Sequence, residues 1–238
     1  MKNMRISGSS TMAGGDYDIL LISGSGTVDG DVRCAEFSAS GSARVKGSLT
    51  AETSLRCSGS AHIEGDAAAE VFRCSGSVHV GGDINAGEMH CSGAVKADGN
   101  INAKRISASG SINAGGDAGA DELHVTGCIR AGGLISGDKV EIRLSGGGSS
   151  ARSVGGGEIT IAPSTNGGLL SKLIGGRSAG RFSCETIEGD RLELENVTAD
   201  TVRGAEVHIG GGCRIKRVEY SEEIFCDDAA AVDETVKI

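Results

Sequence analysis

The chain has 238 residues, of which 40 are Gly, one is Pro, four are Phe, two are Tyr and none is Trp. A globular core of this length normally contains more aromatic volume, yet a composition that is 38% hydrophobic excludes simple disorder. The formal net charge of −9 excludes a general nucleic-acid binder, which needs a basic surface.

Residues 1–144 contain a repeat of about 17 residues, the length of one turn in a solenoid. Its most visible element is a Ser-Gly pair that recurs at intervals of 16 to 18 residues, and Thr126-Gly127 continues the series. The pairs begin at Ser7, Ser23, Ser40, Ser58, Ser75, Ser92 and Ser109.

Each repeat also contains three pairs of apolar residues, and the two members of a pair are two positions apart. This is the period of a β-strand, because alternate side chains of a strand point to the same face. Three short strands with two inward residues each predict a three-sided turn. One such turn contains the pairs Ala61 and Ile63, Ala67 and Ala69, and Phe72 and Cys74.

Gly and Asp recur at fixed positions between these strands, and we expect them at the corners. Gly accepts positive φ angles, and the Asp side chain can bond nearby backbone. Stacked turns would bury the apolar pairs and pair their strands in parallel. Because crossovers between parallel strands are almost always right-handed, the prediction is an all-β, right-handed parallel β-helix. The left-handed hexapeptide helix is the competitor, but its six-residue motif is not seen here.

The repeat weakens after residue 144. We predict a Gly-rich excursion over 145–181, containing a short strand from Glu158 to Ile161. Within it, an apolar helical face could contact a membrane or a partner, or could pack on the solenoid as a lid. This face consists of Leu169, Leu170, Leu173 and Ile174, beside Lys172.

From residue 182 the alternating pattern returns, and 182–225 is predicted to form further, less regular turns. The remaining residues, 226–238, are acidic at Asp227 and Asp228 and are predicted to form a loose tail.

Candidate chemistry in the sequence is sparse. Cys57, Cys74 and Cys91 occupy one inward column, which could bind a soft metal, but small buried Cys residues commonly serve as packing. An Asp column at the corners could attract cations, although corner geometry explains it more simply; it consists of Asp31, Asp66, Asp83 and Asp117. No His is paired with a Ser or Cys at a spacing typical of a nucleophile and its base. We therefore expect no enzymatic activity, no cofactor and no metal.

A short-turned, Gly-rich β-helix of this kind resembles the bactofilin family of bacterial cytoskeletal proteins. The resemblance rests on the repeated sequence pattern seen in Ser75 to Ala86. It extends over about 20–142 and more loosely over 182–225. It implies a non-enzymatic scaffold that polymerises without nucleotide through the ends of the β-helix and supports cell shape, envelope organisation or motility. The chain is longer than a typical bactofilin and lacks its Pro-rich tails.

The ends of a β-helix expose strand edges and apolar cross-sections that invite pairing. A polymer contact and a simple core cap are both open for the apolar residues near the two ends. These residues are Ile6, Ile19, Leu20, Tyr220, Ile224 and Phe225.

The expected partners are the protein itself or a related bactofilin, inner-membrane or envelope proteins, and no nucleic acid. With no apolar h-region after Lys2 and Arg5, and no run of 18 apolar residues, we expect a cytoplasmic protein with optional peripheral contact at the inner face of the cell membrane. Two alternatives are a monomeric adaptor and a β-helical carbohydrate enzyme; the lack of Trp argues against the second.

Overall fold

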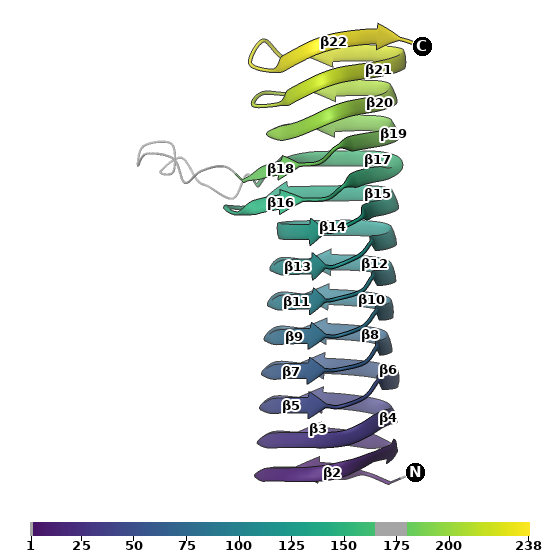
Figure 1. The fold of residues 1–238 in the computed structure, drawn as a ribbon, viewed down its shortest axis with the longest axis vertical. Coiled ribbons are helices and arrows are strands. Elements are labelled where there is room, and N and C mark those ends of the chain that lie inside the picture. Colours follow the sequence, from purple (N-terminus) through teal and green to yellow (C-terminus); the bar gives the residue numbers. More distant parts are fainter. Residues whose placement is uncertain (1, 165–179) are drawn as a thin grey trace. The chain divides into compact units, whose positions relative to one another are not determined.

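The structure is a computed structural model that describes residues 2–164 and 180–238. It contains two compact units, Met1–Ala118 and Gly119–Ile238, which we call the N-terminal and C-terminal units. In each unit parallel strands stack turn upon turn, as the labelled strands in Figure 1 show. The described residues form ~13 turns of ~17 residues, and no helix occurs among them. The predicted parallel β-helix is confirmed.

The N-terminal unit contains the most regular turns. Its strands are β1 Met4–Ile6, β2 Ser9–Asp16, β3 Ile19–Ile22, β4 Ser25–Ala39, β5 Ser42–Val45, β6 Leu49–Cys57, β7 Ser60–Ile63, β8 Ala67–Cys74, β9 Ser77–Val80, β10 Ile84–Cys91, β11 Ala94–Ala97, β12 Ile101–Ala108 and β13 Ser111–Ala114.

The turn formed by β7 and β8 shows how the apolar pairs build the core. All six predicted inward residues are buried, and the side chains between them face outward. Two residues rather than one separate Ala69 from Phe72, which places a corner inside β8. Each inward residue lies directly against its equivalent in the next turn, as Phe72 does against Met89. The three predicted pairs per turn are therefore confirmed.

One corner of the N-terminal unit is held by a ladder of side chains bonded to backbone. The backbone N–H of Asp83 donates to Asp66 Oδ1 at 2.8 Å, and that of Asn100 donates to Asp83 Oδ1 at 2.7 Å. Asn100 Oδ1 in turn accepts from the N–H of Asp117 at 2.8 Å. This ladder gives the predicted Asp column a structural role at the corner.

The Ser-Gly corner depends on close approach of successive turns. A Cβ atom added at Gly93 would collide with the backbone carbonyl oxygen of Gly76 in the preceding turn. Any larger residue would push the two turns apart, which explains why Gly recurs at this corner.

The C-terminal unit has the same parallel architecture with less regular turns. Its strands are β14 Ala118–Ala131, which starts at the boundary, β15 Leu134–Leu144, β16 Gly148–Ser150, β17 Ser153–Pro163, β18 Arg181–Ser183, β19 Thr186–Leu194, β20 Val197–Ile209, β21 Arg214–Cys226 and β22 Ala231–Lys237.

Two boundaries predicted from the sequence differ from the structure. Much of the predicted excursion is regular, because β16 and β17 continue the stack and β17 pairs with β15 and β19. The predicted loose tail over 226–238 is also wrong, because β22 pairs in parallel with β21. The short strand expected at Glu158 to Ile161 lies inside β17, and the further turns expected over 182–225 are present.

Candidate assembly surface

The first turn of the N-terminal unit presents an open strand edge. Among the described residues, β1 is paired only with β3, and β2 only with β4. In the described part of the chain, the backbone groups on the other side of these two strands have no strand partner. Ser9–Ala13 of β2 contains no charged residue and no Pro, so this stretch lacks the usual protection against pairing with another chain, whereas Arg5 in β1 and the register shift between Ala13 and Gly15 protect the rest of the edge.

The side chains that finish the core at this edge are two methionines that the sequence analysis did not select. Met4 lies against Leu20 and Met12 against Val28, and both methionines are half-buried. Leu20 is fully buried beneath Met4, so it belongs to the core rather than to the edge. Of the other predicted residues, Ile6 is buried in β1, whereas Ile19 is half-buried.

The last turn of the C-terminal unit presents a second edge with a different character. Strand β22 pairs with β21 as far as Tyr220, and the residues of β21 beyond it pair only with β20 among the described strands. Phe225 is 55% exposed and lies edge-on to His208, with ring centroids 4.6 Å apart. The predicted Ile224 is half-buried in the same segment, as is Tyr220 before it.

The inward positions of this last turn are partly polar. Thr235 lies over Val218, and Lys237 lies over Tyr220, with its Nζ atom 5.9 Å from the ring centroid. Polar residues at the end of a solenoid column keep the core from water without offering an apolar partner surface. The inward column is therefore more polar here than at the end formed by β1 and β2, although Phe225 and Ile238 of this end remain 55% and 63% exposed.

Ion pairs fasten the last turn to the two turns before it. Arg217 contacts Glu234 in β22 and Glu219 in β21, both at 2.7 Å, and Arg203 in β20 contacts Glu219 at 2.7 Å. Hydrogen bonds from Arg217 and then Arg203 hold the pKa of Glu219 below its ordinary value. The three strands β20, β21 and β22 are thus linked by one charged ladder.

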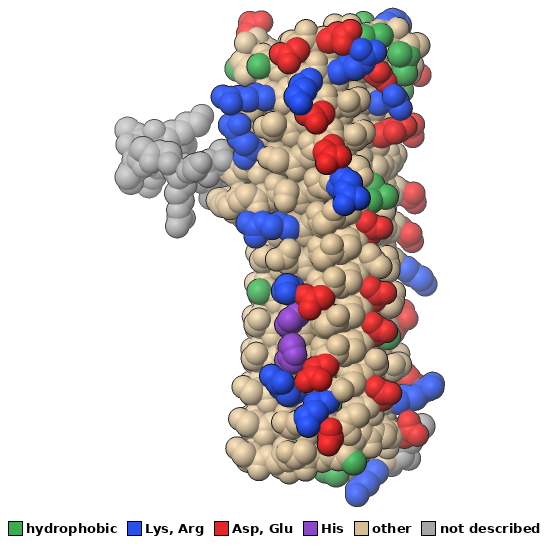
Figure 2. All heavy atoms as spheres, in the orientation of Figure 1, with side chains coloured by type: hydrophobic (Ala, Val, Ile, Leu, Met, Phe, Trp, Pro, Cys, Tyr) green, Lys and Arg blue, Asp and Glu red, His purple; other side chains and the backbone are tan. Residues whose placement is uncertain are grey.

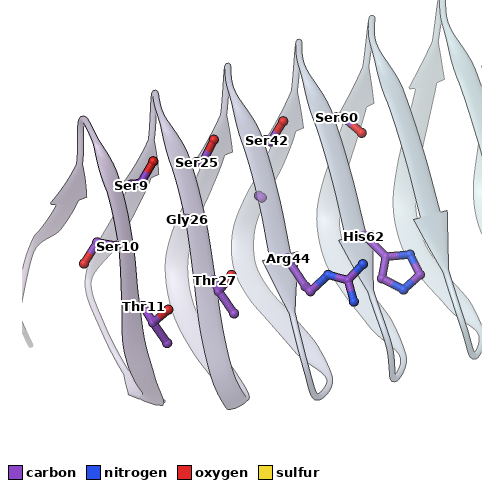
Figure 3. A pocket seen from close by; sticks show the side chains of 11 residues that line it. Ser9, Ser10, Thr11, Ser25, Gly26, Thr27, Ser42, Arg44, Ser60 and His62 are labelled. Carbon is purple, nitrogen blue, oxygen red and sulfur yellow. The ribbon is translucent and has the colours of Figure 1, made fainter.

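A shallow hollow of about 550 Å³ lies beside the N-terminal edge, across β2, β4, β5 and β7. Figure 3 shows its hydroxyl side chains arranged turn by turn, with the Arg44 and His62 side chains in neighbouring turns. Arg44 is paired with Glu64 at 3.4 Å, and the His62 ring lies 4.9 Å from that of His79. The hollow offers hydrogen-bonding groups that continue from the open edge onto the outer face.

The predicted thiol column is present and buried in the N-terminal unit. Cys57, Cys74 and Cys91 lie in register, and each Sγ donates to the carbonyl oxygen of the Gly two residues later, at 3.3 to 3.5 Å. Burial raises the pKa of Cys57 to about 11. A protonated thiol that bonds a corner carbonyl stabilises the turn and is a poor nucleophile at neutral pH.

Within residues 2–164 and 180–238, no group of three or more His, Cys, Asp or Glu side chains is placed to hold a metal ion. No helix in the same ranges has the length and apolar character needed to cross a membrane. One predicted contact lies outside the described residues. It comprises Leu169, Leu170, Lys172, Leu173 and Ile174.

The architecture defines the protein as a parallel β-solenoid with open terminal edges. Part of the chain is similar to two Bacillus subtilis proteins, each named an uncharacterized protein. A segment of 101 residues is 40% identical to YhbE and covers 42% of this chain and 41% of that protein. A segment of 62 residues is 44% identical to YhbF and covers 26% of each. The matched segments thus span less than half the length of either relative. No family model and no solved structure matches the chain.

Proposed function

We propose that the protein is a non-enzymatic scaffold that assembles, without nucleotide, into polymers through the terminal turns of its β-solenoid. Such a polymer would support cell shape, envelope organisation or motility from the cytoplasm, with peripheral contact at the inner face of the cell membrane. Its partners would be further copies of itself or a related bactofilin, and inner-membrane or envelope proteins.

The open edge of β1 and β2 carries this proposal. It is uncharged over Ser9–Gly15, it lacks a strand partner among the described residues, and its core is finished by Met4 and Met12. Stacking a further turn on this edge would satisfy the free backbone groups and bury both methionine side chains. The resemblance of the repeat to the bactofilins supports the same function. YhbE and YhbF are named as uncharacterized proteins and therefore indicate no activity.

A monomeric adaptor is the second candidate, and the polar end formed by β22 favours it. Asp233 and Glu234 lie on this strand, and Thr235 and Lys237 occupy inward positions. Charges on an edge strand oppose pairing with another chain. A protein that is capped at this end and occupied by a partner at the other would not polymerise alone.

Negative-stain electron microscopy of the purified chain, without nucleotide, tests the proposal. We expect filaments from the unchanged protein. Met12→Lys should abolish them, because it places a charge at an inward position of the open turn. The matched control is Thr50→Lys, which adds the same charge to an exposed outward position of β6, away from the open edge, and should leave filaments intact.

Circular dichroism must show that Met12→Lys keeps its β-structure, since one half-buried position at a terminal turn should tolerate the change. Filaments that persist in Met12→Lys would remove the open edge from the mechanism. Discrete particles from the unchanged protein at every concentration and salt level would favour the adaptor.

A further inference from the structure

Three arginines of the C-terminal unit lie on one side of the solenoid, two of them in one column and the third two residues to its side. Arg130, Ser150, Ser183, Thr198 and Arg214 occupy one column in five successive turns. Arg181 is two residues before Ser183 and faces outward in the same turn. The row therefore carries an arginine in the first, third and fifth turns, and only hydroxyl residues between them.

Three acidic residues form a second row in the same turns. One aligned column of these turns contains Lys139, Arg191 and Glu223. The residues immediately before them in the chain are the three acids, Asp138, Asp190 and Glu222. The turns between them carry Gly157 and Ala205 at this position.

The two rows thus have the same period and opposite charge. With turns ~4.8 Å apart, each row has a charge about every 10 Å. An arginine and the acid of its own turn are eight or nine residues apart, which is about half of a ~17-residue turn and places the rows on different sides. In Figure 2, basic side chains gather at the edge of this unit that carries β16 and β18, and acidic ones at the opposite edge.

All six side chains are exposed, and among the described residues none of them forms an ion pair. Other charges of the same unit are paired with one another: Arg191 with Glu206 and Glu158, and Lys216 with Asp200. One further cation approaches the acidic row, since Lys237 Nζ lies 3.4 Å from the backbone carbonyl oxygen of Glu222.

We infer that these rows join two copies of the chain side by side, with the arginine row of one copy against the acidic row of the next. Because the rows share the lattice of the solenoid, three ion pairs form together when two copies lie at the same height. Two arginine rows would repel each other, so the contact is heterologous. Each added copy leaves one row free, and the association can continue as a sheet or bundle.

The contact is expected to be weak between single copies, because exposed ion pairs in water contribute little. Its strength rests on the proposed function: in a polymer many such contacts act together, which raises the overall affinity without new chemistry. It must also weaken with salt, because screening acts over about 10 Å at 0.1 M and about 3 Å at 1 M ionic strength.

Charge reversal tests the inference. In one variant, R130E/R181E/R214E, both rows are acidic; in the other, D138K/D190K/E222K, both are basic. The unchanged protein should form bundles at low salt by electron microscopy, or soluble oligomers by analytical ultracentrifugation. Each variant alone should lose this association, and an equimolar mixture of the two should regain it. The matched control, R56E/R73E/K104E, reverses three exposed cations of the N-terminal unit and should associate normally.

The outcome is separable from that of the polymer proposal. Single filaments that never bundle would overturn this inference and leave the polymer proposal standing. Oligomers that are lost in each charge-reversed variant and regained in the mixture, without any filaments, would support this inference and overturn the polymer proposal. Failure of the mixture to associate would also overturn it. A third result would also overturn it: the unchanged protein does not self-associate but binds phosphatidylglycerol vesicles, and R130E/R181E/R214E loses that binding. The arginine row would then contact lipid.

Discussion

The two units use the same architecture but differ in the regularity of their turns and in how much they rely on a corner ladder or on ion pairs between turns. Between β8 and β10, and between β10 and β12, every paired residue lies 17 positions from its partner, and a ladder of Asp and Asn side chains bonds the corner backbone. In the C-terminal unit Val140 pairs with Ile159, 19 positions on, and Leu192 with Val207, 15 positions on. There, Arg–Glu pairs such as Arg203–Glu219 cross between turns, as Arg33–Glu52 and Arg44–Glu64 also do in the N-terminal unit.

This difference indicates that a constant turn length permits a short, directional side-chain ladder, whereas a variable one favours long side chains. An Asp reaches only the backbone of the next turn, so it requires strict register. Arg and Glu have longer, more adaptable side chains and tolerate a shift of a residue or two. The N-terminal unit should therefore be sensitive to shape, and the C-terminal unit to salt and pH.

The largest expected effect is that of Phe72→Ala in the regular unit. Phe72 is fully buried between Leu55 and Met89 of adjacent turns. Its truncation should leave a cavity and cost about 3–5 kcal/mol of unfolding free energy. Urea unfolding followed by thiol labelling measures it, because Cys74 reports on this unit and Cys213 on the other.

If the units differ as described, Cys74 should become reactive at lower urea in Phe72→Ala while Cys213 stays protected. The outward neighbour Arg73→Ala serves as the control and should change neither. Equal deprotection of both thiols would show that the two units unfold together.

The same regularity decided what could be predicted from the sequence. The inward columns of the N-terminal unit, including Phe72 and Met89, follow from a period that hardly varies. The first half of strand β17 was missed because Gly155–Gly157 is typical of a loop, although Gly156 is required where a Cβ would meet the carbonyl of Gly137. Strand β22 was missed because its residues are mostly polar, although Val232 lies 17 positions after Ile215.

The candidate surfaces were less predictable than the fold. Met4 and Met12 could have been found, since each stands 16 residues before its inward partner, but the shortened first turn hid this relation. The arginine and acidic rows could not, because Arg181 and Asp190 are aligned with their rows only after turns of unequal length have been stacked.

A smaller effect is expected from the corner ladder. Asp83→Ala removes the acceptor of the Asn100 N–H and should cost about 0.5–1.5 kcal/mol. Asp83→Asn keeps an acceptor, as Asn100 does one turn later, and removes the repulsion between Asp83 and Asp66. It should match or exceed the stability of the unchanged protein. Thermal unfolding compares the three proteins; equal loss in both variants would show that charge, not the hydrogen bond, matters at this corner.

The smallest expected effect is that of Arg217→Gln, and its dependence on pH is the informative quantity. Because the pKa of Glu219 is lowered in the folded state, its stabilising contribution is complete above the ordinary Glu value of about 4.3 and is lost as pH falls through the folded value. The protection of the β22 amides against hydrogen exchange, relative to an unfolded chain at the same pH, should be lower below pH 4 than at pH 7 in the unchanged protein. Arg217→Gln removes the main hydrogen bond that lowers the pKa of Glu219, and also the ion pair with Glu234. The protection of β22 should therefore already be lower at pH 7 in this variant, and it should fall less on acidification. An unaltered pH dependence would mean that the last turn is held by its backbone pairing with β21 and not by the charged ladder.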